Sequence, residues 1–287
     1  MMKTKLYMLT ETSEFMMSFV VLTQRGNAIV VDGGREEDMP LLRQYVGGRR
    51  IEAWILTHPH SDHIGGFVSE MRKNGGADFD VGRVYYCFPD YEEFVKKPNV
   101  PDRDYFLSDL NEMLPAFLDA EPLFVDRAHI VRQGERITVD EVLIEFLYTG
   151  RDGLYTNPIN DYSLVFKLTA PGKSVLFLGD LGPEGGEALL SESRGKLKAD
   201  LVQMAHHGHM CVGREVYEAV APTACLWCAP RWLYEEEQIP PYLADREKLR
   251  RMGRERMFGT ALTRRWMDEL GVATHYVTAD GTQEIEL

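Results

Sequence analysis

The chain has 287 residues, of which 44% are hydrophobic and 27% are charged, so it carries enough apolar material for a globular core. Its formal net charge is −13, from 32 basic and 45 acidic side chains. Because an acidic protein repels polyanions at long range, loose binding to nucleic acid or to anionic lipid is disfavoured. Its apolar runs are far shorter than the roughly 20 residues of a membrane-spanning helix, and the N-terminus is more typical of strands than of a signal peptide. We therefore expect a cytoplasmic protein with no membrane partner.

Short runs of branched and aromatic residues alternate with segments of helical periodicity along the whole chain. Strands are predicted at 18–23, 27–32, 51–57, 82–87, 136–139, 142–148, 163–169, 174–180, 199–205 and 223–229. Helices are predicted at 41–46, 105–118, 185–191, 214–220 and 262–270. This interspersed order favours one layered α/β domain over residues 1–287. The charged, proline-containing segment 88–125 indicates an insertion or lid within it.

Several predicted strands end in a residue that can bind a metal. Asp32, His58, Asp180 and His206 each stand at the end of an apolar run, at most two positions after its last apolar side chain. In α/β folds, sites commonly form where the carboxyl ends of strands meet at one sheet edge. We therefore expect these side chains to converge.

The strongest motif is the segment Thr57–Gly66, which reads T-H-P-H-S-D-H-I-G-G. Imidazole and carboxylate groups suit zinc, iron or manganese, and we expect His58 and His60 to serve one ion and Asp62 and His63 its neighbour. The two glycines at its end are expected to let the backbone turn tightly as the following helix begins. A histidine-rich surface loop is the alternative, but adjacent desolvated imidazoles are costly unless something binds them.

The order of these motifs resembles that of the metallo-β-lactamase superfamily. The H-x-H-x-D-H spacing resembles the family signature, Asp32-Gly33-Gly34 its early D-G-G turn, and Gly179-Asp180 the strand end that carries a bridging carboxylate. The resemblance extends from Asp32 to His207 and implies a four-layer αββα sandwich with a dinuclear metal centre.

Three segments are similar to the hydrolase domain of ComEC-type competence proteins, which take up DNA. They are NDYSLVFKLTAPGKSVLFLGDL, LKADLVQMAHHGH and the final THYVTADGTQEIEL. The chain departs from that subgroup in having His209 where a serine is usual, and it has no membrane portion, so a role in transport is not implied.

The resemblance also implies roles for individual residues. Asp180 is expected to bridge the two ions, and Asp62, His63 and His206 to complete the second site. His207 is then expected to contact the substrate or its leaving group. Exchange of His206 and His207 between these two roles is the alternative.

One expected ligand is missing, since family members usually supply a third histidine to the first metal before the G-D strand. The only histidine in that interval is His129, for which an ordinary place beside a strand is favoured. An oxygen of Asn160 or Asp161 is a candidate replacement, and an oxygen-rich site would favour manganese. Asp32 is expected to support the turn or the ligands rather than to bind metal.

These features predict an enzyme, a metallo-hydrolase that uses two divalent cations, zinc or alternatively manganese, and a metal-bridging hydroxide. Its catalytic residues would be Asp62, Asp180 and His207. The favoured substrates are phosphoesters, as in a phosphodiesterase or nuclease-like enzyme, with nucleic acid disfavoured by the net charge. The alternatives are hydrolysis of carboxylic esters, thioesters, lactones or lactams, and a non-catalytic metal-binding module of the same fold.

Three further features allow both a functional and a structural interpretation. Arg231 suits a substrate phosphate, although loop packing is the favoured interpretation. The pair Cys225 and Cys228 lies in a predicted buried strand, so a structural role is favoured over redox or metal chemistry. The basic stretch Arg246–Arg256 is interpreted as a solvated helix face rather than a polyanion contact.

Overall fold

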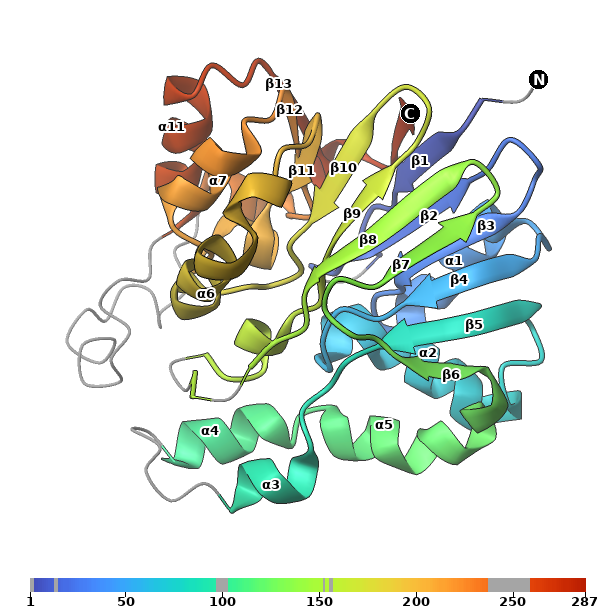
Figure 1. Ribbon diagram of the computed structural model, residues 1–287. Coiled ribbons are helices and arrows are strands. Elements are labelled where there is room, and N and C mark those ends of the chain that lie inside the picture. Colours follow the sequence, from blue (N-terminus) through green and yellow to red (C-terminus); the bar gives the residue numbers. More distant parts are fainter. Residues whose placement is uncertain (1–2, 13–14, 97–102, 152, 155–156, 237–258) are drawn as a thin grey trace.

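Two β-sheets lie face to face in the computed structural model, and helices cover their outer faces (Figure 1). The structure describes residues 3–12, 15–96, 103–151, 153–154, 157–236 and 259–287. The stretch Arg246–Arg256 lies outside the described residues. The layers form the four-layer αββα sandwich that the sequence predicted.

The first sheet contains both ends of the described chain. Its strands are β1 (Lys5–Met8), β2 (Ser18–Leu22), β3 (Ala28–Asp32), β4 (Ile51–Ile55), β5 (Val81–Tyr86), β6 (Ala128–Ile130) and β14 (Gln283–Glu286). Their order across the sheet is β14-β1-β2-β3-β4-β5-β6. The pairs from β3 to β6 are parallel, so the carboxyl ends of β3 and β4 point to the same edge.

The second sheet is built from the later part of the sequence. Its strands are β7 (Arg136–Val139), β8 (Val142–Tyr148), β9 (Val165–Thr169), β10 (Ser174–Phe177), β11 (Leu201–Gln203), β12 (Ala224–Trp227) and β13 (Thr274–Val277). They lie in the order β13-β12-β11-β10-β9-β8-β7. The pairs from β10 to β13 are parallel, which again brings their carboxyl ends together.

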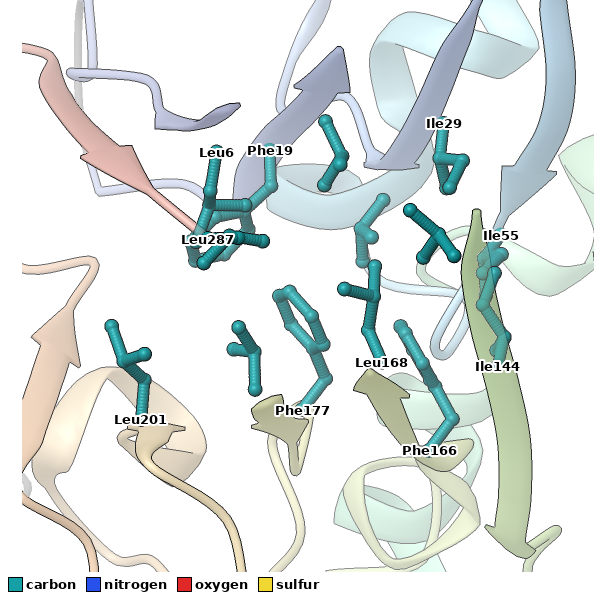
Figure 2. Packing of buried hydrophobic residues seen from close by; sticks show 14 of the residues in the cluster. Leu6, Phe19, Ile29, Ile55, Ile144, Phe166, Leu168, Phe177, Leu201 and Leu287 are labelled. Atoms are coloured by element: carbon teal, nitrogen blue, oxygen red, sulfur yellow. The ribbon is translucent and has the colours of Figure 1, made fainter. Parts of the chain in front are cut away.

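The main apolar core lies between the sheets, where inward-facing residues of both interdigitate (Figure 2). Phe19 of the first sheet and Phe177 of the second are fully buried, and their rings meet edge to face with centroids 5.1 Å apart. Burial of such aromatic side chains is a large part of what holds the two sheets together.

The described helices are α1 (Met39–Val46), α2 (Ser61–Asn74), α3 (Tyr91–Val95), α4 (Arg103–Leu110), α5 (Leu114–Ala120), α6 (Pro183–Ser193), α7 (Arg214–Val220), α8 (Arg231–Glu235) and α11 (Thr260–Glu269). Apolar residues of α1, α2 and α5 pack on the outer face of the first sheet. Those of α6, α7, α8 and α11 pack on the second. None of the helices in the described ranges has the length and hydrophobicity needed to cross a bilayer.

The structure corrects two predicted helix boundaries. The pattern at 105–118 is two helices, α4 and α5, and Pro115 stands in the first turn of α5, a position where proline is favoured. Helix α2 begins at Ser61, so Gly65 and Gly66 lie inside it rather than before it. At Gly66 an added Cβ would lie 2.8 Å from the carbonyl oxygen of Arg35, so the glycine allows close packing of α2 rather than a turn.

The two cysteines of the C-x-x-C pair face different layers. Cys225 packs with the helices outside the second sheet, and Cys228 packs in the core between the sheets. Both are buried free thiols. Their positions support the structural role favoured by the sequence.

Candidate metal centre

The expected convergence of strand ends takes place at one edge of the sandwich, between the two sheets. The loop after β4 carries His58 and His60, and the turns after β10 and β11 carry Asp180, His206 and His207. All five of these side chains are buried, with exposures of 9% or less. Each sheet therefore supplies about half of the polar groups.

Four buried side chains at this edge form the tightest cluster, and two of them, Asp62 and His63, come from the start of α2. Donor atoms of Asp62, His63, Asp180 and His207 all lie within 4.8 Å of one another. The Nε2 atom of His63 is 3.2 Å from Asp180 Oδ1, and the Nε2 atom of His207 is 3.1 Å from Asp62 Oδ2 and 3.4 Å from Asp180 Oδ2. Two imidazoles and two carboxylates at these distances form a suitable donor set for one divalent cation.

A second group of imidazoles lies on the other side of Asp180. His58 Nε2 is 3.1 Å from His60 Nδ1, so these two nitrogens face each other. His58 Nε2 and His206 Nε2 are 3.9 Å and 3.8 Å from Asp180 Oδ2. His206 thus lies with His58 and His60, whereas His207 lies with Asp62 and His63, the cluster that His206 was expected to complete.

An unusual backbone allows both neighbouring histidines to point into the site. His206 and His207 have φ angles of 48° and 56°, so two consecutive residues adopt the left-handed conformation within the turn Ala205–Gly208. Non-glycine residues rarely adopt this conformation, and such strain is concentrated at functional sites. Sequence patterns give no sign of it.

The loop with Asn160 and Asp161, from which an oxygen was expected in place of the missing histidine, places one of these two side chains beside the histidines. The side chain of Asn160 lies 3.3 Å from His206 Nε2, and its Oδ1 atom is buried without a hydrogen-bond partner among the described residues. Asp161 instead accepts hydrogen bonds from the backbone N–H groups of Gly182 and Gly185, both at 3.0 Å. Asp161 therefore fastens this loop to the start of α6, and Asn160 faces the histidines.

In each histidine ring of the centre except that of His206, the nitrogen that points away from the centre makes a hydrogen bond to a neighbouring group. His63 donates from Nδ1 to Asp32 Oδ2 at 2.7 Å, and His207 donates from Nδ1 to the carbonyl oxygen of Cys228 at 2.7 Å. Asp32 also accepts hydrogen bonds from the backbone and hydroxyl of Thr57. As expected from the sequence, Asp32 supports the site from behind.

His60 is held in the same way by a residue that sequence analysis missed. Its Nε2 atom lies 3.0 Å from Asp109 Oδ1, on helix α4. Nearby, Glu112 accepts hydrogen bonds from the backbone and hydroxyl of Ser61. Both acidic residues belong to the segment 88–125, where no spacing or motif distinguishes them from other acidic residues.

Burial and charge compete in setting the protonation of the cluster. Burial lowers the pKa of His206 to about 4, and it also disfavours a charge on His207, but there the neighbouring carboxylates of Asp180 and Asp62 raise the pKa to about 9. Although burial opposes it, the nearby His63 and His207 hold the pKa of Asp180 well below its usual range. The carboxylates are therefore ionised and stabilise positive charge beside them.

These observations fit a bound divalent cation. His63 Nε2 and Asp180 Oδ1 are buried and have no hydrogen-bond partner among the described residues. Buried polar atoms are normally satisfied, and imidazole nitrogens with carboxylate oxygens are the donor set of zinc and manganese sites.

A cavity of about 450 Å³ opens onto this cluster. It is lined by Phe15, Arg35, His60, Asp62, Tyr105, Ser108, Asp109, Glu112, Asn160, Asp180, His206 and Met210. Arg231 is not among the described residues of this lining; its guanidinium is bound to Glu235 and Asp280 at 3.0 Å and 2.5 Å. The volume suits a small molecule.

The protein is therefore an α/β protein with an αββα sandwich, and its buried imidazoles and carboxylates form a candidate metal site at one edge of the sandwich. A model of the metallo-beta-lactamase superfamily matches residues 15–210, more than half of the chain. The protein belongs to this superfamily, whose members usually bind divalent metals and are mostly hydrolases.

Solved structures show the same fold at low sequence identity. The metallo-beta-lactamase fold protein YhfI from Bacillus subtilis is 13% identical, with a TM-score of 0.55, and the match covers 98% of this chain and all of that one. A mutant of the CmlA beta-hydroxylase is 15% identical, with a TM-score of 0.51, over the whole of this chain and 54% of that one. No curated protein sequence matches the chain significantly.

Proposed function

We propose that this protein is a hydrolase that uses two divalent cations, zinc or alternatively manganese, to cleave small phosphoesters. The observation that carries the proposal is the position of Asp180, whose carboxylate lies between the two groups of imidazoles. Divalent cations held on both sides of it would supply a hydroxide near neutral pH and neutralise charge on the attacked group.

The proposed ligands follow from which nitrogens face Asp180. For one cation they are Asp62, His63, His207 and Asp180. For the other they are His58, His60, His206 and Asp180, with Asn160 beside them. In this assignment His206 takes the place of the histidine that the middle of the sequence lacks.

The chain's own groups would prepare the site for catalysis in two ways. Asp32 and the carbonyl oxygen of Cys228 hold the rings of His63 and His207 with their Nε2 atoms toward the centre. Such contacts fix the ring orientation and strengthen the ligand. The side chains of Phe15 and Met210 would add apolar surface to the cavity wall.

The size and charge of the cavity support a small substrate. Asp109 and Glu112 on its wall would repel the backbone of a nucleic acid, which adds to the effect of the net charge. Arg35 also lines the cavity, and a guanidinium suits the oxygens of a single phosphate. The three sequence segments that are similar to a ComEC-type hydrolase domain also favour phosphoesters over carboxylic esters as substrates.

A substrate panel tests the proposal. Protein loaded with zinc or manganese should hydrolyse bis(4-nitrophenyl) phosphate or a phosphonate ester, and activity should fall when a chelator removes the metal. Turnover of nitrocefin, lactones or thioesters without phosphoester cleavage would establish the alternative class. Metal binding without turnover of any of these substrates would favour the non-catalytic module.

A further inference from the structure

Helix α4 brings a carboxylate to the metal centre from outside both sheets. Asp109 is 8% exposed, and its Oδ1 atom lies 3.0 Å from His60 Nε2. Its Oδ2 atom accepts a hydrogen bond from the backbone N–H of Ile159 at 3.2 Å, and the Tyr105 hydroxyl donates to Oδ1 at 3.3 Å. The carboxylate is therefore held in position on both of its oxygens.

This contact determines which nitrogen of His60 faces the centre. A neutral imidazole has one N–H and one lone pair, on different nitrogens. When Nε2 donates to Asp109, the lone pair of His60 is on Nδ1, which is 3.1 Å from Nε2 of His58. Both nitrogens that face each other can then bind one cation.

A small apolar cluster holds α4 in place. Phe106 and Leu110 of α4 pack with Phe94 of α3 and with Ile159 and Tyr162 of the loop that carries Asn160. Phe94 and Tyr162 meet edge to face with ring centroids 4.9 Å apart. The position of Asp109 thus depends on how the helices α3 and α4 pack on the rim of the site.

We propose that Asp109 is a positioning residue, through which the packing of α3 and α4 controls cation binding at His58 and His60. The other outer contacts, from Asp32 and Cys228, belong to the ends of strands and are fixed with the sheets. Asp109 differs because it lies on helix α4, in the segment 88–125 for which the sequence indicates an insertion or lid. This inference rests on the proposed two-cation site.

The test is a metal titration of the full chain after removal of its metals. We expect wild-type protein to bind two equivalents of Co²⁺ or Zn²⁺ by calorimetry. In Asp109→Ala the affinity for one equivalent should fall about 10- to 100-fold, with the other unchanged, and the absorption spectrum of the Co²⁺ form should lose the contribution of one ion. Asp109→Asn should lie between, since an amide oxygen still accepts the hydrogen bond but carries no charge.

Asp104→Ala is the matched control, because Asp104 is an exposed carboxylate on the same helix. It should bind both equivalents like the wild type. If Asp109→Ala is poorly folded by circular dichroism, the comparison rests on Asp109→Asn. Equal binding by wild-type and both Asp109 variants, or an equal loss at both sites, would overturn the inference alone. Absence of binding by the wild type would overturn the proposed function as well.

Discussion

The Nε2 atom of His207 lies 3.1 Å from Oδ2 of Asp62, although the two residues are 145 positions apart in the sequence. His206, the next residue, instead lies beside Asn160, with 3.3 Å between His206 Nε2 and Asn160 Nδ2. Two adjacent histidines thus have different neighbours, although both Nε2 atoms lie near Oδ2 of Asp180.

Because the two histidines lie in different clusters, we expect the replacement of each to remove a different cation. His207→Ala should remove the cation held by Asp62 and His63, and His206→Ala the one held by His58 and His60. Each variant should bind about one equivalent per chain by elemental analysis. If both variants lost the same ion, identified by its Co²⁺ spectrum, the assignment of the two rings would be refuted.

Replacement of Asp180 should affect both cations. Because its carboxylate lies near imidazoles of both groups, His63 and His207 on one hand and His58 and His206 on the other, Asp180→Ala should weaken both binding events. Turnover should fall by more than about 100-fold, the upper range for loss of a mere supporting contact. Asp268→Ala, an exposed residue on α11, is a suitable control. Turnover by Asp180→Ala that matched this control would contradict the proposed role.

Cation binding at neutral pH should release protons. Burial lowers the pKa of His60 and His207, but Asp109 beside the first and Asp180 beside the second raise it to about 9. Below that pH the protonated rings must lose a proton before they bind, so affinity should increase as the pH rises toward about 9 and then level off. Calorimetry in buffers of different ionisation enthalpy measures the released protons, and identical heats in all buffers would argue against this coupling.

The glycine of the motif that packs most tightly should be intolerant of a side chain. In Gly66→Ala the new Cβ would overlap the sulfur of Met39 and lie 2.8 Å from a backbone oxygen, so the free energy of unfolding should fall by about 1–3 kcal/mol in urea denaturation. Gly195→Ala is the matched control, since a Cβ there meets no atom within 4 Å. Equal stability of the two variants would show that α2 can shift without cost.

Much of this protein was determined by local sequence pattern. Short runs of branched and aromatic residues predicted ten of the fourteen described strands, and polar residues at or shortly after the ends of β3, β4, β10 and β11 predicted where the site lies. A strand or a metal motif is visible in sequence because neighbouring residues form it. Strands β1, β6, β13 and β14, of three or four residues each, were not among the predicted ranges.

Only the tertiary structure decided which side chains face each other. Asp109 has no distinguishing motif and becomes part of the site because α4 packs on the rim beside His60. Asn160 and Asp161 are adjacent, yet one faces the histidines and the other binds the backbone of α6. The roles of His206 and His207 depend on two left-handed backbone conformations, which are stabilised by contacts distant in sequence and leave no mark on local pattern.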